Sequence, residues 1–201
     1  MRRNFTLVEL LVVTVIIGII VGATVPAFTR LMTGNAVSYG LRMTTSQLNM
    51  ARTEACARRK YVAVVFPNDS SAFSGNNIGY LCAYRSCYVT RNAANDYTFE
   101  KWVPGTKWEY LPRGAYFSSV AGLPLSVKKV KDEEGTLLDA NEHTVKAVIF
   151  SSSGRAADKK AFAVEVREGV VTDNSTVSRN NNPDNKLTAK VNSYTGSIRT
   201  E

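Results

Sequence analysis

The feature that most constrains this chain is an uncharged, largely apolar run from Leu10 to Phe28. Its length is about that of a helix that crosses the hydrocarbon core of a bilayer. Two arginines precede the run and no basic cluster follows it directly, which predicts a cytoplasmic N-terminus and an exported remainder. Glu9 stands at the edge of the run, where a carboxylate costs about 3 kcal/mol unless a partner offsets that cost. The segment therefore predicts a single membrane pass, and Glu9 predicts a functional partner.

Two simpler interpretations of this run are a cleaved secretory signal and a plain signal anchor. The run is longer than the apolar part of a typical signal peptide, and the stretch GAT at 22–24 is only a weak cleavage site. Neither interpretation explains why Glu9 is present.

A helical pattern continues beyond Pro26. Small or apolar side chains recur at steps of three and four, which is the spacing of one helix face; they are Val37, Leu41, Thr44, Leu48, Ala51 and Ala55. The pattern predicts one helix from about residue 5 to about residue 57, and Arg58, Arg59 and Lys60 suit its C-terminus. Because this helix is longer than a bilayer needs, its outer half must pack against the rest of the chain.

From Tyr61 onward the apolar period changes from helical to alternating, which is typical of β-strands. The predicted strands are 61–66, 78–84, 97–102, 144–150, 161–168 and 186–194. Turn-forming stretches separate them. The predicted fold class is α+β, with a long N-terminal helix packed on an antiparallel β-sheet.

The composition bears on three features: an anionic partner, a disulfide and a metal site. The 201 residues carry 25 Lys and Arg against 17 Asp and Glu, a formal charge of +8, which suits an anionic partner. Cys82 and Cys87 are close enough in sequence to predict a disulfide, although Cys56 could pair with either of them. The single histidine, His143, is interpreted as a loop residue, so no metal site is expected.

The N-terminus, FTLVELLVVTVIIGIIVGATVP after a short basic leader, resembles that of type IV pilins and type II secretion pseudopilins. The resemblance implies that a prepilin peptidase cuts between Asn4 and Phe5 and methylates the new amino group of Phe5. It also implies that Glu9 neutralises the N-terminal amine of a neighbouring subunit in a filament. The peptidase normally cuts after glycine, and here Asn4 stands in that place. Gly18, Gly22 and Pro26 fall where these proteins carry residues that loosen the helix.

A narrower resemblance is to the GspH/FimT group of minor pilins and pseudopilins. It rests on QLNMARTEACARRKYVAVVF, VIFSSSGRA and the closing VNSYTGSIRT. The implied organisation is a leader at 1–4, an apolar transmembrane and filament-core helix at 5–29, its amphipathic continuation at 30–59 and an exported β-rich domain at 60–201. Some DNA-binding members carry G-R-x-R near the C-terminus, where this chain has Gly196, Ser197, Ile198 and Arg199.

The sequence contains no recognisable catalytic constellation or cofactor motif. It has no GxSxG elbow, P-loop or GxGxxG after a strand, and the acids at 132–134 are interpreted as a mixed-charge turn. Cys56 is interpreted as a buried residue of the helix face rather than a nucleophile. We therefore expect a protein without enzymatic activity and without a cofactor.

The resemblance implies a minor pilin or pseudopilin that primes or caps a type II secretion pseudopilus or a type IV pilus. The implied partners are other pilins, the prepilin peptidase and the bacterial inner membrane, which the chain crosses once before it joins a filament. Its globular domain would be periplasmic. An alternative is a pilus-tip protein that takes up DNA, with Arg58, Arg59, Lys60 and Arg199 as contacts. A membrane-anchored exported enzyme is the third and weakest alternative.

Overall fold

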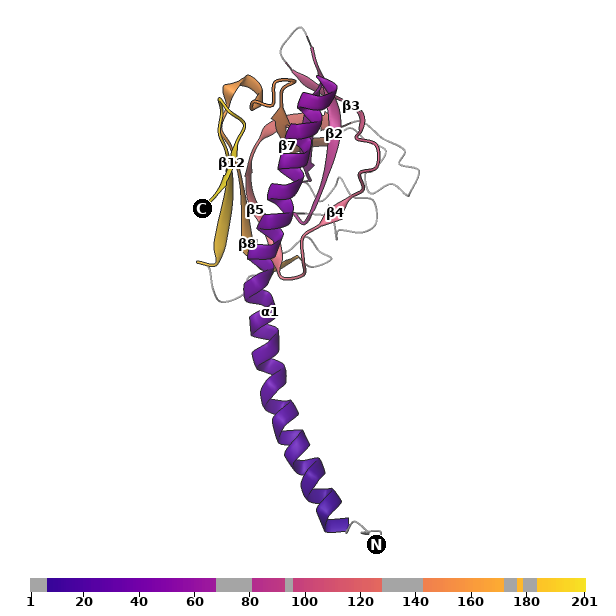
Figure 1. Ribbon diagram of the computed structural model, residues 1–201, viewed down its shortest axis with the longest axis vertical. Coiled ribbons are helices and arrows are strands. Elements are labelled where there is room, and N and C mark those ends of the chain that lie inside the picture. The colour runs from indigo at the N-terminus through magenta and orange to yellow at the C-terminus, as the bar shows by residue number, and fades with distance from the viewer. Residues whose placement is uncertain (1–6, 68–80, 93–95, 128–142, 172–176, 179–183) are drawn as a thin grey trace.

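A computed structural model of the chain describes residues 7–67, 81–92, 96–127, 143–171, 177–178 and 184–201. Within these ranges, only the backbone is described at residues 23, 25–34, 143 and 178. One long helix, α1 (Leu7–Arg58), extends from a β-rich domain (Figure 1). The helix is continuous through Gly18, Gly22 and Pro26 and curves gently along its length (Figure 1).

The first sheet closes on itself. Its strands are β1 (Tyr61–Phe66), β2 (Ala83–Arg91), β3 (Tyr97–Trp102), β4 (Glu109–Tyr110), β6 (Leu123–Val127) and β7 (His143–Phe150). The order is β1-β7-β6-β3-β2-β4, and β1 also pairs with β2, so five strands form a ring with β4 at the edge.

The second sheet is antiparallel and open. It has the order β12-β11-β8-β5, formed by β5 (Ala115–Ala121), β8 (Phe162–Glu168), β11 (Lys186–Val191) and β12 (Ile198–Thr200). A further pair joins β9 (Val170–Val171) to β10 (Val177–Ser178), and a short 3-10 helix, η3 (Ala157–Lys159), precedes β8.

The expectation of a single antiparallel sheet was therefore wrong in two respects, because the strands form separate sheets and the first of them is mixed. β3 and β6 run parallel and pair at Thr98 and Ser126, which closes the ring and makes the first sheet mixed and barrel-like. Parallel neighbours need a crossover connection. The segment 103–122 supplies it, because it passes through β4 and into β5 of the second sheet before it returns as β6.

The predicted stripe of α1 is buried and joins the two sheets. All six of its side chains are buried: Val37, Leu41, Thr44, Leu48, Ala51 and Ala55. In this part of the chain α1 packs over β1 and β7 of the first sheet and over β5, β8, β11 and β12 of the second (Figure 1). A buried polar contact also helps to fix the orientation of α1 on the first sheet. The Gln47 side chain donates a hydrogen bond of 2.8 Å to the Ser86 hydroxyl on β2.

Strand prediction succeeded for β1 and β3, whose bounds match, and nearly so for β7 and β8. Of the strand predicted at 78–84, residues 78–80 lie outside the described residues, residues 81–82 form a turn, and β2 begins at Ala83. The strand predicted at 186–194 ends at Val191 and is followed by a turn. His143 is not in a loop, because it begins β7 opposite Val127.

Candidate assembly surface

Every residue of the protruding half of α1, residues 7–22, is exposed. Exposure ranges from 82% at Leu7 to 48% at Val13 among the large apolar residues. These are Leu7, Val8, Leu10, Leu11, Val12, Val13, Val15, Ile16, Ile17, Ile19, Ile20 and Val21. An apolar surface that continues around the whole helix marks a segment that is covered by something other than water.

The hydroxyl groups of Thr14, in this half, and of Thr24, just beyond it, are satisfied within the helix. Thr14 donates to the carbonyl of Leu11 at 2.8 Å, and Thr24 donates to the carbonyl of Ile20 at 2.9 Å. A hydroxyl that is already paired costs little to bury in an apolar environment. The protruding half is therefore suited to apolar surroundings in its polar groups as well as its apolar ones.

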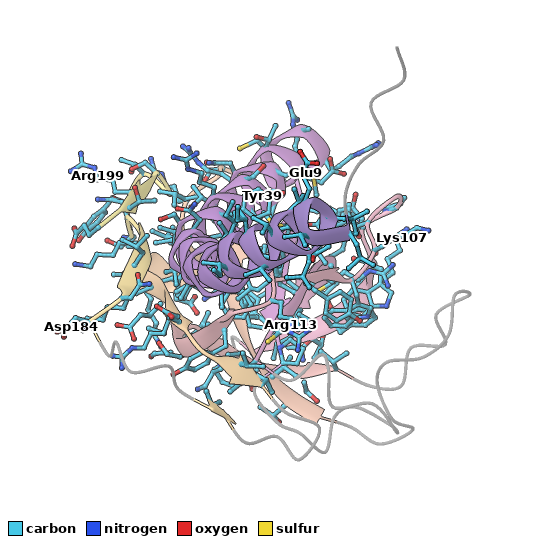
Figure 2. All side chains as sticks on the ribbon, turned by 90° about the horizontal axis from the view of Figure 1, so that it is seen from below. Glu9, Tyr39, Lys107, Arg113, Asp184 and Arg199 are labelled. Atoms are coloured by element: carbon cyan, nitrogen blue, oxygen red, sulfur yellow. The ribbon has the colours of Figure 1, made fainter. Side chains whose placement is uncertain are left out.

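Glu9 is the charged residue of the protruding half and lies in the first turn of α1, on its exposed surface (Figure 2). A carboxylate in this position interacts favourably with the positive end of the helix dipole. Asn4 and Phe5, the predicted cleavage and methylation residues, lie outside the described residues. In the part of the chain that the structure describes, no helical segment reaches the length and apolarity of a membrane span.

The embedded end of α1 is joined to two turns that are distant in sequence. Arg52 donates from Nε to the carbonyl of Gly154 at 3.0 Å and from Nη2 to the carbonyl of Thr195 at 2.9 Å. Gly154 and Gly196 have positive φ angles of 73° and 67°, which favours glycine. A Cβ on Gly196 would also collide with the Gly154 carbonyl oxygen. The three segments of the GspH/FimT resemblance therefore meet at one point, which fixes the C-terminal hairpin to α1.

The expected Cys82–Cys87 disulfide is absent, and all three thiols are free. Cys87 lies within β2 and Cys82 immediately precedes it. Five residues of extended chain span about 16 Å, whereas bridged cysteines have Cα atoms less than about 7 Å apart. Burial raises the pKa of the Cys82 thiol to about 12 and also raises that of Cys87, so both thiols stay protonated. Cys56 is exposed, contrary to expectation, and its sulfur lies beside Gly154 in the turn after β7.

The basic residues proposed for DNA contact do not form one track. Arg58 pairs with Glu54 at 3.2 Å, and Lys60 pairs with Glu100 at 2.9 Å. Arg59 is exposed and ends the helix in a left-handed conformation with a φ angle of 54°. Arg199 lies on β12, on the flank of the domain opposite Lys107 (Figure 2). The structure thus brings Arg58 and Lys60 together but leaves Arg199 on another surface.

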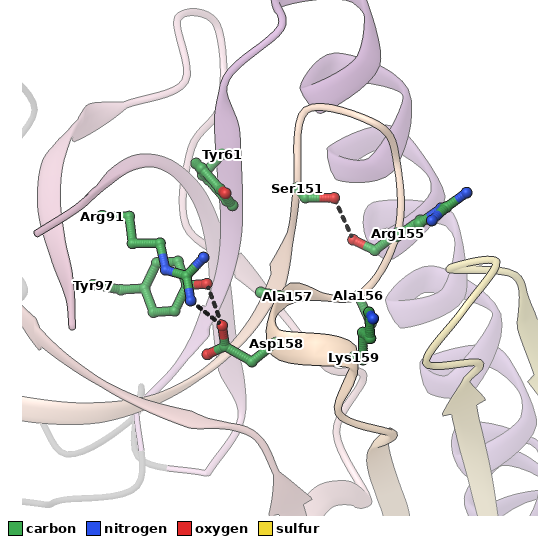
Figure 3. Close-up of a pocket in the computed structure, with 9 residues that line it drawn as sticks. All are labelled: Tyr61, Arg91, Tyr97, Ser151, Arg155, Ala156, Ala157, Asp158 and Lys159. Carbon is green, nitrogen blue, oxygen red and sulfur yellow. Dashed lines mark hydrogen bonds and ion pairs between the residues drawn. The ribbon is translucent and has the colours of Figure 1, made fainter. Parts of the chain in front are cut away.

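A cleft of about 440 Å³ lies between the ends of the first sheet and the β7–β8 connection (Figure 3). Its floor is a polar network in which Asp158 accepts hydrogen bonds from Arg91 at 2.8 Å and from the Tyr97 hydroxyl at 3.1 Å. Burial and the contact with Asp158 raise the pKa of Tyr97 to about 12, so its hydroxyl stays protonated. The Ser151 hydroxyl donates to the carbonyl of Arg155. The described lining of this cleft therefore offers no activated nucleophile.

Among the described residues no group of His, Cys, Asp and Glu side chains could hold a metal ion. The acids at 132–134 lie outside the described residues. The Asp158 network was not predicted from the sequence, nor was the contribution of Tyr88 and Lys101 to the surface around Arg58. The alternation in YTFEKW could have indicated Lys101, because alternate residues of a strand point to the same face of the sheet.

No protein-family model matches this chain, and no curated protein matches it. The solved structures similar to it include a minor pilin and a minor pseudopilin. The type IV minor pilin FimU of Pseudomonas aeruginosa aligns with 83% of this chain and 89% of its own, at 10% identity and a TM-score of 0.47. The minor pseudopilin EpsH of the type 2 secretion system of Vibrio cholerae covers 82% of this chain and 95% of its own, at 11% identity and a TM-score of 0.43. At these values the likenesses do not say what this chain does.

Proposed function

We propose that this chain is a minor pilin or pseudopilin that primes or caps a filament through its N-terminal helix. The observation that carries the proposal is one continuous helix with an embedded half and a fully exposed apolar half. Burying each large apolar side chain contributes about 1.5–3 kcal/mol. Twelve such side chains give residues 7–22 a strong drive to leave water for a membrane and then for neighbouring helices.

Glu9 gives this packing its register. Before assembly the helix spans the inner membrane once, with the globular domain on the periplasmic side, and the Glu9 carboxylate is costly there. Prepilin peptidase cuts between Asn4 and Phe5, and the methylated amine of Phe5 then carries a positive charge. When a subunit joins the filament, its Glu9 pairs with the Phe5 amine of a neighbour and the cost is offset. Gly18, Gly22 and Pro26 let the helix adjust locally as it packs.

The test is the isosteric substitution Glu9→Gln in the full chain, which removes the charge and keeps the shape. We expect incorporation into sheared filaments to fall at least tenfold, while the protein in the membrane fraction keeps its folded domain. Glu201→Gln, at an exposed acid of the domain, is the matched control and should assemble normally. Normal incorporation of Glu9→Gln would overturn the proposed role.

Processing has a separate test. Intact mass of the exported protein should correspond to a chain that begins at methylated Phe5. A mass that still includes residues 1–4 would contradict the proposed cut, and with it the charge pair. Asn4→Gly should increase the processed fraction, because it restores the residue that the peptidase normally requires.

A further inference from the structure

A groove lies beside the C-terminal end of α1, where Tyr88 of β2 and Lys101 of β3 contribute to its lining. Figure 1 shows the position of β2 and β3 next to this end of the helix. One wall is a helix stripe at four-residue spacing, Met50, Glu54 and Arg58, and the other is the turn at 103–106. The groove consists of two adjoining hollows of about 240 and 270 Å³ that share Arg58 and Pro104 in their linings.

The two ends of the groove differ in chemistry. Met50, which is 43% exposed, lies with Val103 and Pro104 at the apolar end. Arg58, Lys60 and Lys101 surround the buried Tyr88 at the other end, where the two lysine ammonium groups lie 5.5 and 5.9 Å from the Tyr88 ring centroid. The groove therefore has an apolar surface at one end and a cluster of three cations at the other.

The cations face the solvent and the acids beneath them are already engaged. The side chains of Arg58 and Lys60 are 68% and 48% exposed, whereas those of their partners Glu54 and Glu100 are 25% and 30% exposed. Glu54 accepts hydrogen bonds from both Arg58 and the Tyr88 hydroxyl through the same oxygen. A partner that approaches the groove thus meets positive charge first.

The wall opposite the helix is held rigidly. Thr106 donates from its hydroxyl to the carbonyl of Val103 at 2.6 Å, and its own carbonyl accepts from Arg85 at 2.6 Å. Val103 donates its amide to Ser86 on β2. A groove that is already formed loses less conformational entropy when it binds a ligand.

We infer that this groove docks a polypeptide segment of a different protein, one that carries an apolar side chain beside a carboxylate. The apolar side chain rests on Met50 and Pro104, and the carboxylate lies among Arg58, Lys60 and Lys101. The chain's formal charge of +8 disfavours a second copy as the occupant. A nucleic acid would use the cations but not the apolar end. This site functions whether or not α1 enters a filament, so it stands apart from the proposed function.

The test uses the purified full chain in detergent micelles and a fluorescent nonapeptide of alternating leucine and glutamate. Fluorescence anisotropy should show that this peptide binds at least tenfold more tightly than a matched peptide with glutamine in place of glutamate. Lys60→Glu/Lys101→Glu should lower the affinity at least tenfold, and the milder Lys60→Gln/Lys101→Gln about fivefold. Met50→Ser should lower it about threefold through the apolar end.

The matched control is Lys186→Glu/Lys190→Glu, which changes the net charge equally at exposed lysines of β11 in the second sheet. It should change the affinity less than twofold. An equal loss in this control, or equal binding of the glutamine peptide, would reduce the effect to net charge and overturn the inference. Displacement of the peptide by a 20-base-pair DNA duplex that requires Lys60 and Lys101 would assign the groove to nucleic acid instead. Self-association of the chain that is lost in Lys60→Glu/Lys101→Glu would assign it to a second copy.

Discussion

The two halves of α1 belong to one helix but meet different surroundings. In the embedded half, Val37, Leu48 and Ala55 have no exposed surface, and the residues between them, such as Ser38 and Asn49, face solvent. In the protruding half every side chain from residue 7 to residue 22 is exposed and nearly all are apolar. A helix with one apolar stripe can bury that stripe against one surface. A helix that is apolar on all sides is buried only when it is surrounded on all sides. The first half is thus covered by this chain's own domain, whereas the second stays uncovered along the described residues 7–22.

The largest expected difference in stability comes from making the same Leu→Ala substitution in each half of α1. Leu48→Ala removes a fully buried side chain and should lower the free energy of unfolding by about 2–5 kcal/mol. Leu11→Ala, on a side chain that is 55% exposed, should change it by less than about 0.5 kcal/mol. Chemical denaturation of the full chain in micelles measures both. Similar losses at the two positions would show that the halves do not differ as described.

The attachment of the embedded half to the C-terminal hairpin can be broken at Gly196. Alanine there needs an unfavourable positive φ and places Cβ against the Gly154 carbonyl, so we expect a loss of about 2–4 kcal/mol. Gly105→Ala separates the two causes, because Gly105 has a φ angle of 78° with nothing within 4 Å of the added Cβ. It should cost only about 1 kcal/mol. An equal cost at both glycines would mean that the close approach is unimportant.

Arg52 tests the same attachment from the helix side. Arg52→Met keeps much of the side-chain volume and removes the hydrogen bonds to Gly154 and Thr195, so it should cost about 1.5–3 kcal/mol. Hydrogen exchange should accelerate in β11 and β12 before it does elsewhere in the domain. Arg42→Met, at an exposed position of the same helix, should leave exchange unchanged. Uniform acceleration in Arg52→Met would indicate a global rather than a local effect.

The smallest effect concerns a surface of β8 that α1 does not cover. The hydrogen bond from Ser118 and the neighbouring Arg167 hold the pKa of Glu165 below its ordinary value of 4.5. A lowered folded pKa contributes stability that is present above pH 4.5 and is lost as the pH falls through the folded value. Since Glu165 is partly exposed, the contribution is about 1 kcal/mol or less. Glu165→Gln should flatten the decline in stability below pH 4.5, as measured by denaturation across pH, and an unchanged decline would exclude this role for Glu165.

Local patterns predicted the parts of the fold that depend on local sequence. The spacing of Val37, Leu41 and Leu48 predicted the embedded stripe, and the alternation in YVAVVF predicted β1 with its correct bounds. Ring closure could not be predicted, because β3 and β6 are paired across a crossover through another sheet. β5 and β6 were missed because AYFSSVAGLPLSV contains a glycine and a proline, which are typical of turns.

Of the two candidate surfaces, the protruding half of α1 depends on local sequence and the groove depends on residues that are distant in the chain. The apolar run and Glu9 are contiguous in the sequence, so their combination is recognisable from the order of residues alone. The groove combines Arg58, Tyr88 and Lys101 from three elements, and only the pairing of Tyr88 with Lys101 across β2 and β3 brings them together. The Cys82–Cys87 prediction failed for a related reason, since closeness in sequence means separation along an extended strand.

The two hydrogen bonds of Arg52 can both be made only after the C-terminal hairpin has been synthesised. Arg52 and Thr195 are 143 positions apart, so the helix is synthesised long before its last acceptor. Contacts between such distant residues form slowly. Until the hairpin of β11 and β12 has folded against α1, part of the stripe of the embedded half is uncovered. During that time both halves of α1 expose apolar surface. The C-terminal residues thereby complete the cover of the stripe, because β11 and β12 both contact α1.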